Sequence, residues 1–175
     1  MKRSIFSFIF LALFLMVSAQ SSPADKIFEK YSGKEGFTSV YISKYMFELF
    51  SSIGGDDPES MELQDVIKGL NSINILTVED RTKIPAGVDI YKELMTEIPK
   101  HGYKEFMIIK DNDQTVRFLF WETKGKVSEL LLAVGGNTEQ VIISIRGDIN
   151  LKSISKLSRM IDMPGIEKLE KTQKK

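Results

Sequence analysis

The sequence predicts an α+β domain built on a mixed, mostly antiparallel sheet of about six strands, with helices packed mainly on one face. Two observations predict it. Apolar residues recur at helical spacing in several segments of the first half of the chain. The second half contains four apolar segments in succession, joined by short sequences rich in glycine, asparagine and aspartate.

The first predicted elements are a short helix and a strand. Residues 25–31 predict a helix, because their apolar residues fall on one helical face and the glycines within residues 33–36 end it. Residues 37–42 are dense in β-branched and aromatic side chains and predict a strand.

Two helices follow this strand. Met46, Leu49 and Phe50 recur at helical spacing and predict the first of them. The second starts after Asp57, since an aspartate N-cap followed by Pro58 is a typical helix start. The next predicted elements are a strand over 73–78 and a helix over 88–98.

The second half predicts an antiparallel meander and a closing helix. The links between its strands, residues 111–113, 124–126 and 135–137, have turn chemistry at hairpin length. The closing helix has its apolar residues at 151, 154, 157 and 161. The four predicted strands are Tyr103–Lys110, Thr115–Thr123, Val127–Val134 and Gln140–Arg146.

The tripeptide Arg146-Gly147-Asp148 lies where the last predicted strand meets the closing helix. Gly147 suits a backbone turn that other residues resist. Asp148 or Asn150 can cap the free amides of the helix, and Asn150 is favoured because the apolar period starts at Leu151. We therefore interpret Gly147, Asp148 and Asn150 as a structural strand-to-helix junction.

The start of the chain has the pattern of a secretory signal peptide. Lys2 and Arg3 precede an apolar run over residues 5–17, and Ala19 suits the last position before a cleavage site. The expected location is the periplasm, the cell envelope or the exterior. The predicted organisation is a signal peptide (1–19), an N-terminal segment with a short helix (20–36), a single α+β domain (37–163) and a charged tail (164–175).

Composition excludes several classes of function. The chain has 24 basic and 24 acidic residues, and without Lys2 and Arg3 the balance is 22 to 24, a net charge of −2. This balance argues against a nucleic-acid surface. The sequence contains no cysteine and only one histidine, His101, which excludes thiol catalysis and the common zinc geometries. We expect no cofactor and no metal.

The predicted strands are apolar on both faces. In such a sheet something must cover the second face: the N-terminal helix, another copy of the chain or a ligand. Cover by the chain's own elements is the favoured interpretation, and an interaction face is the alternative. Val116, Phe118 and Phe120 predict the core face of their strand, whereas Leu119, Trp121 and Ile142 belong to the other, possible interaction face.

Three segments together resemble a known family. They are the segment from Phe37 to Phe47, the segment from Gly102 to Met107 and the segment from Gly147 to Leu151. The sequence is similar to the domain of unknown function 4252 family, small exported domains of Bacteroidetes-type bacteria. The resemblance implies an exported domain and no particular chemistry. Many members carry a cysteine after the signal peptide for lipid attachment, whereas this chain has Gln20.

The leading functional hypothesis is an exported, non-enzymatic domain that binds protein partners or self-associates, with no nucleic acid and with membrane contact only through the signal peptide. The first alternative is a hydrolase that uses carboxylates such as Asp111, Asp113 or Glu122. The second is an adhesion protein that acts through Arg146-Gly147-Asp148; it ranks last because a short motif is weak evidence without an exposed loop.

Overall fold

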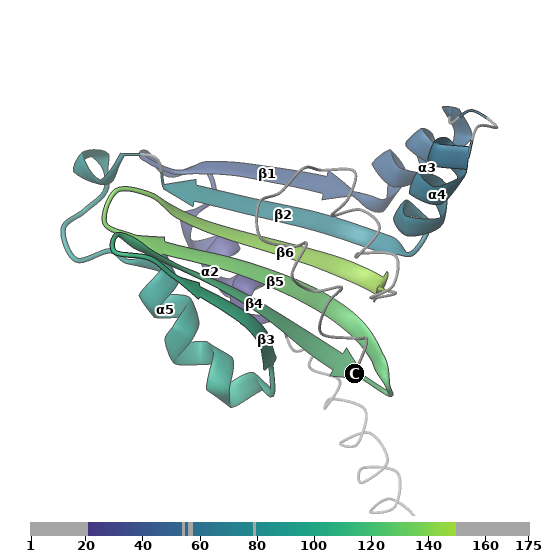
Figure 1. Cartoon of the computed structure of the whole chain (residues 1–175). Coiled ribbons are helices and arrows are strands. Elements are labelled where there is room, and N and C mark those ends of the chain that lie inside the picture. Colours follow the sequence, from purple (N-terminus) through teal and green to yellow (C-terminus); the bar gives the residue numbers. More distant parts are fainter. Residues whose placement is uncertain (1–20, 54, 56–57, 79, 150–175) are drawn as a thin grey trace, which may run out of the picture.

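The computed structural model describes residues 21–53, 55, 58–78 and 80–149 (Figure 1). Every helix and strand that the sequence predicts within these residues is present. The helices are α2 (Pro23–Tyr31), α3 (Lys44–Ile53), α4 (Pro58–Ile67) and α5 (Ile90–Glu97). The strands are β1 (Thr38–Ser43), β2 (Leu70–Val78), β3 (Lys104–Lys110), β4 (Gln114–Thr123), β5 (Lys126–Gly136) and β6 (Gln140–Ile149).

The six strands form one sheet in the order β1-β2-β6-β5-β4-β3. All neighbouring pairs are antiparallel, so the predicted mixed sheet is corrected to a wholly antiparallel one. The topology explains why. After α5, the chain enters β3 at the far edge of the sheet, and β3 runs in the same direction as β2. The three hairpins that link β3, β4, β5 and β6 then each reverse the direction of the chain. The meander therefore returns β6 antiparallel to β2.

Helices α2 and α5 cover the first face of the sheet. They lie against each other, and Lys30 and Tyr31 of α2 both contact the carboxylate of Glu93 on α5 at 2.8 Å. The apolar side chains of this face and of the two helices form the larger core cluster. Its members include Ile27, Phe28, Leu76, Val78, Ile90, Leu94, Leu119, Leu131, Ala133 and Ile142.

The second face of the sheet is apolar as well. Helices α3 and α4 cover only one end of it, beside β1 and β2 (Figure 1), through Phe47 and Ile67. We define the second face by the described residues that share it in the strand register: Ile73 and Ile75 of β2, Val116, Phe118 and Phe120 of β4, Leu130, Leu132 and Val134 of β5, and Val141, Ile143 and Ile145 of β6.

The two faces are the reverse of the prediction for β4. Leu119 is 2 % exposed beneath the helices, whereas Phe118 and Phe120 of the predicted core face are only partly buried. Because β4 is apolar on both sides, its alternation cannot show which side the helices will cover. That choice depends on where α2 and α5 pack.

The closing strand is longer than predicted. β6 continues through Gly147 and Asp148 to Ile149, and β2 shifts its register beside Gly147. Gly147 has a φ of +154°, and a Cβ there would overlap the carbonyl oxygen of Gly69. Gly147 is thus required inside the sheet, where two backbones approach closely. Asn150 and the predicted closing helix lie outside the described residues.

Candidate functional site

The carboxylates proposed for hydrolysis lie at opposite ends of β4. Asp111 and Asp113 are exposed in the β3–β4 turn, and Glu122 near the other end of the strand forms an ion pair with Lys104 at 2.9 Å. At about 3.3 Å per residue, the nine steps from Asp113 to Glu122 separate them by about 30 Å. These three side chains therefore do not form one site.

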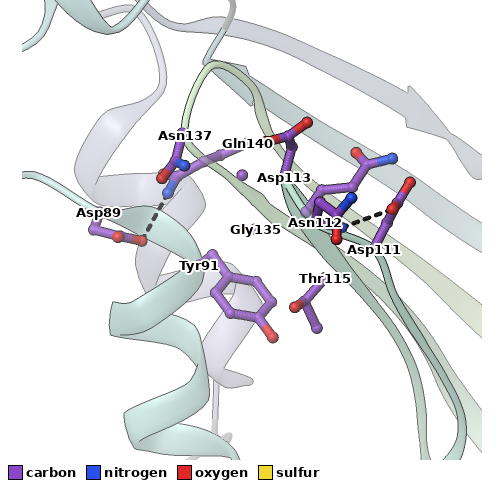
Figure 2. A pocket seen from close by; sticks show the side chains of 11 residues that line it. Asp89, Tyr91, Asp111, Asn112, Asp113, Thr115, Gly135, Asn137 and Gln140 are labelled. Atoms are coloured by element: carbon purple, nitrogen blue, oxygen red, sulfur yellow. Dashed lines mark hydrogen bonds between the residues drawn. The ribbon is translucent and has the colours of Figure 1, made fainter.

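A shallow polar pocket of about 270 Å³ lies at the turn end of the meander (Figure 2). Asp111 and Asp113 line it together with Asp89, Tyr91 and Gln140. Asp89 is already engaged: it caps α5 by accepting a hydrogen bond from the amide of Lys92 at 2.9 Å and another from Gln140 at 2.8 Å. The pocket thus consists of helix-cap and turn groups.

Within the described residues, no three acidic or histidine side chains lie together in a way that could hold a metal ion. His101 ends the 3-10 turn after α5, and its Nδ1 lies 2.9 Å from the carbonyl oxygen of Glu97. It is therefore used locally, at the end of the helix.

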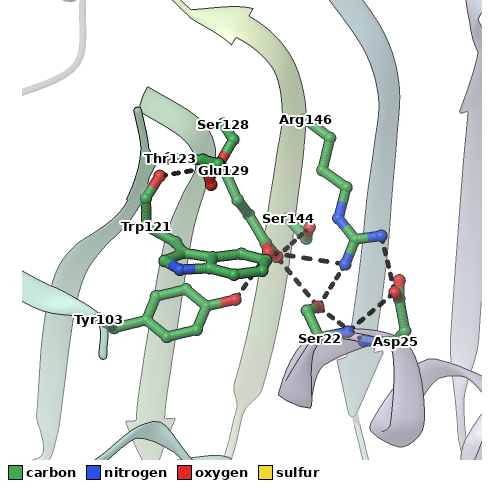
Figure 3. Close-up of polar contacts among 9 residues, drawn as sticks. All are labelled: Ser22, Asp25, Tyr103, Trp121, Thr123, Ser128, Glu129, Ser144 and Arg146. Carbon is green, nitrogen blue, oxygen red and sulfur yellow. Dashed lines mark hydrogen bonds and ion pairs between the residues drawn. The ribbon is translucent and has the colours of Figure 1, made fainter. Parts of the chain in front are cut away.

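A buried polar cluster joins α2 to the first face of the sheet (Figure 3). Its centre is Glu129 of β5, which is 1 % exposed. One carboxylate oxygen accepts hydrogen bonds from Ser144 at 2.7 Å and Ser22 at 3.3 Å. The other accepts one from Tyr103 at 2.6 Å and lies 3.6 Å from a guanidinium nitrogen of Arg146.

Arg146 carries the positive charge of this cluster. It forms an ion pair with Asp25 of α2 at 2.6 Å and donates a hydrogen bond to Ser22, the N-cap of the same helix. Burial opposes the charge of Arg146, but the carboxylates of Glu129 and Asp25 outweigh it and raise the pKa of the guanidinium. Arg146 thus stays charged and holds α2 on the sheet.

Tyr103 completes the cluster on the opposite side of Glu129. Burial raises the pKa of the phenol, and the negative charge of Glu129 raises it further. The Tyr103 proton is therefore held in the hydrogen bond to Glu129 instead of being available for transfer. Since each polar group named in this cluster has a partner within it, its role is to fix the helix to the sheet.

The structure separates the members of Arg146-Gly147-Asp148. Arg146 is tied into the buried cluster, and Gly147 lies within β6. The exposed Asp148 forms an ion pair with Lys126 at 2.5 Å, and its amide donates to the carbonyl of Gly69 at 2.8 Å. An adhesion motif needs the arginine and aspartate side chains free at a loop tip, and here the arginine lies within a strand and is ion-paired with Asp25.

Several apolar residues of β1, α3 and α4 are exposed. Helix α3 buries Phe47 but exposes Tyr45, Met46, Leu49 and Phe50, with exposed fractions of 44–80 %. These four residues are spaced one and four apart and so share one side of the helix. We call them, together with Val40 and Tyr41 of β1 and Met61 of α4, the β1–α3 surface; these three are also exposed.

The two edges of the sheet differ in their charge. The β3 edge carries Lys104, Glu105 and Lys110, and charged residues protect an edge strand against pairing with another chain. Strand β1 has no charged residue and exposes Val40 and Tyr41. The β1 edge is thus the unprotected one, and β1 leads directly into α3.

The sequence did not single out this surface. An ordinary amphipathic helix would direct Met46, Leu49 and Phe50 to the core, but the buried residue is Phe47. One feature of the sequence could have indicated this surface. The apolar residues 45–47, 49 and 50 are too numerous to lie on one face of a helix.

The residues predicted as a possible interaction face lie elsewhere. Leu119 and Ile142 are 2 % and 0 % exposed in the core beneath α2 and α5, and Trp121 is partly exposed beside the ring of Tyr103. The chain's own helices therefore cover this face.

No curated protein matches the sequence. The model of the family described as domain of unknown function DUF4252 matches residues 31–157, which include the whole described sheet. The chain therefore belongs to the DUF4252 family.

Proposed function

We propose that this protein is an exported, non-enzymatic binding domain of the periplasm or cell envelope, and that its partner is a protein. The observation that carries the proposal is the β1–α3 surface. Exposed apolar patches of this kind on a soluble domain mark interaction sites. The unprotected β1 edge beside it offers backbone hydrogen bonds to an added strand, which is a common mode of peptide recognition.

The charges around this surface favour a protein over a lipid surface. The charged side chains of α3, Lys44 and Glu48, pair with each other at 3.4 Å, so the helix presents no excess of positive charge. Surface-binding helices of membranes carry lysine and arginine on their polar side. The expected partner is therefore a protein that presents an apolar segment. None of the helices in the described part of the chain has the length and apolar content that a bilayer crossing requires.

The polar groups support binding over catalysis. Glu129 and Arg146 are engaged in fixing α2 to the sheet, and the candidate carboxylates Asp113 and Glu122 lie about 30 Å apart. A hydrolase needs its acid, base and substrate-positioning groups around one cleft.

Export is tested by the N-terminus of the protein purified from cells. The expected result is an envelope or external protein that begins at Gln20, because the predicted cleavage follows Ala19. Cytosolic protein that retains residues 1–19 would contradict the proposal.

Binding is tested by site-specific photo-crosslinking in cells. A photoreactive side chain at Phe50, which is 55 % exposed, is expected to capture a protein, whereas one at Ile108 on the β3 edge, 38 % exposed, is not. Leu49→Glu should abolish the crosslink while leaving the melting temperature unchanged, since Leu49 is 51 % exposed. Equal crosslinking at both positions, or crosslinking that survives Leu49→Glu, would refute the assignment of the surface.

A further inference from the structure

The two outermost strands of the described sheet, β1 and β3, are built differently. Strand β3 carries charged residues at both of its ends, and its pairing with β4 shifts register between Glu105 and Met107. Charges and bulges are the usual devices that keep an edge strand from pairing with another chain. Strand β1 has neither, because it contains no charged residue and its six residues pair with β2 without a shift.

We propose that the partner of the β1–α3 surface is a second copy of the chain, and that the two β1 strands pair antiparallel across a two-fold axis. This inference rests on the proposed function, because it names the partner of that surface. A two-fold axis between antiparallel edge strands stands perpendicular to the sheet, so each face continues on the same side of the joined sheet. Each paired residue of β1 then lies opposite a residue of the same strand that points to the same face.

Two registers pair the most residues of β1 with its copy. The axis passes through Val40 or through Tyr41, since the middle of the six-residue strand lies between them. With the axis at Val40, this residue lies opposite its own copy, and Thr38 lies opposite Ile42. With the axis at Tyr41, Val40 lies opposite Ile42. Val40 therefore meets an apolar residue in both registers, and no charge of the strand meets a like charge.

The charges of β1 and α3 favour a second copy over a different protein. In a two-fold interface, a charged residue near the axis faces the same charge on the other copy, which is unfavourable. Strand β1 has no charge, and the two charged residues of α3, Lys44 and Glu48, pair with each other at 3.4 Å. An interface for a different protein can use charges to select that protein, whereas β1 and α3 together carry no net charge.

The exposed apolar area is of the size that a stable dimer needs. Tyr41 and Tyr45 are 67 % and 80 % exposed. At about 200 Å² for an aromatic side chain, these two offer about 300 Å² in each copy. Met46, Leu49 and Phe50 are each about half exposed and about double this area. Two copies can therefore bury about 1,200 Å² in total, and a specific interface buries at least about 1,000 Å².

The position of α3 brings these residues to the other copy. Helix α3 begins at Lys44, directly after the last residue of β1. Because the two β1 strands run in opposite directions, the end of one strand lies beside the start of the other. Each α3 therefore starts next to the first residues of β1 in the other copy.

The β3 edge limits the assembly to two copies. Joining two sheets at β1 uses both unprotected edges and leaves a β3 strand at each end of the joined sheet. Lys104, Glu105 and Lys110 then protect both ends against further pairing. The expected assembly is thus a closed dimer and not a fibre.

Sedimentation equilibrium of the mature protein tests the dimer. The wild type is expected to be dimeric and Val40→Lys monomeric, because lysine on an edge strand opposes pairing and here would lie near its own copy. The matched control is Ile109→Lys at the β3 edge. Ile109 lies on the same face as Val40, and the two are 41 % and 42 % exposed. This control should stay dimeric. A monomeric wild type, a dimeric Val40→Lys variant or an equal loss in the control would overturn the proposal.

Engineered disulfides test the axis without adding a charge, since the chain has no cysteine of its own. A residue on the axis lies about 5 Å from its own copy between Cα atoms, within the reach of a disulfide. In the other register the same residue is about 8 Å from its copy, which is too far. Either Val40→Cys or Tyr41→Cys should therefore form an intermolecular disulfide on mild oxidation, and Ile109→Cys should not. Yields at both positions that do not exceed the yield at Ile109 would overturn the proposal.

The photo-crosslink at Phe50 separates this inference from the proposed function. An adduct between two copies of the chain supports both. An adduct with a different protein supports the proposed function and overturns the second copy as the partner of this surface. The absence of any adduct contradicts the proposed function, and the sedimentation and disulfide experiments then decide the dimer on their own.

Discussion

The buried cluster around Glu129 predicts that Arg146 is a structural residue. Replacing Arg146 by methionine keeps much of the side-chain volume but leaves Glu129 and Asp25 without their cation. Removing one partner of a buried ion pair costs about 3–5 kcal/mol. The side chains of Arg146 and Asp25 are 27 % and 20 % exposed. We therefore expect the free energy of unfolding to fall by an amount at the lower end of this range, about 3 kcal/mol.

Urea unfolding of the mature protein measures this loss. Trp121 is the only tryptophan and lies beside Tyr103, with ring centroids 6.1 Å apart, so its fluorescence reports on the region of the cluster. In thermal unfolding, a loss of about 3 kcal/mol should lower the melting temperature by about 6–12 °C.

The neighbouring ion pair provides a matched control. Lys126 and Asp148 are also an ion pair of the last two strands, but their side chains are 67 % and 60 % exposed. Lys126→Met should therefore cost less than about 1 kcal/mol. In addition, Glu129→Gln should be less destabilising in the Arg146→Met background than in the wild type, with a coupling of about 1 kcal/mol or more. Equal small losses for Arg146→Met and Lys126→Met, or strictly additive effects, would refute the reasoning.

Two further predictions concern backbone and pH. Gly147→Ala should lower the free energy of unfolding by about 3 kcal/mol or more, because the new Cβ overlaps the carbonyl of Gly69. Gly33→Ala, at a φ of +74° in open space, should lose only about 1–2 kcal/mol in the same urea titration; equal losses would contradict the overlap. Burial, and then the charge of Glu129, raise the pKa of Tyr103, so the unfolded state loses this proton first. Stability from Tyr103 is thus complete below about pH 10 and falls as the pH rises further. In the Tyr103→Phe variant, the free energy of unfolding should therefore decrease less steeply above about pH 10. A variant whose stability falls in parallel with that of the wild type would contradict this prediction.

The order of helices and strands followed from local patterns. The four meander strands needed only apolar runs separated by turn chemistry, and the start of α4 needed only Pro58. These signals lie within a few residues of each other along the chain, so they could be recognised without knowledge of the partners.

The burial of the sheet faces could not be predicted in this way. Phe118 and Leu119 are neighbours of similar hydrophobicity, and only the packing of α2 and α5 decides that Leu119 is buried. The same applies to Phe47, the buried residue of a helix that is apolar on more than one side.

The sequence by itself determined the class of the domain, the succession of its elements and the turn sequences of its hairpins, because propensity and periodicity are local properties. Only the tertiary structure decided the roles of Glu129, Arg146 and Ser22, which come from β5, β6 and the start of α2. Ser22 and Arg146 are 124 residues apart, and their contact exists only because the sheet brings β6 beneath α2. The sequence gives the chemical type of each residue, but long-range packing determines its partners. That packing pairs the arginine of an adhesion-like motif with carboxylates of α2 and β5.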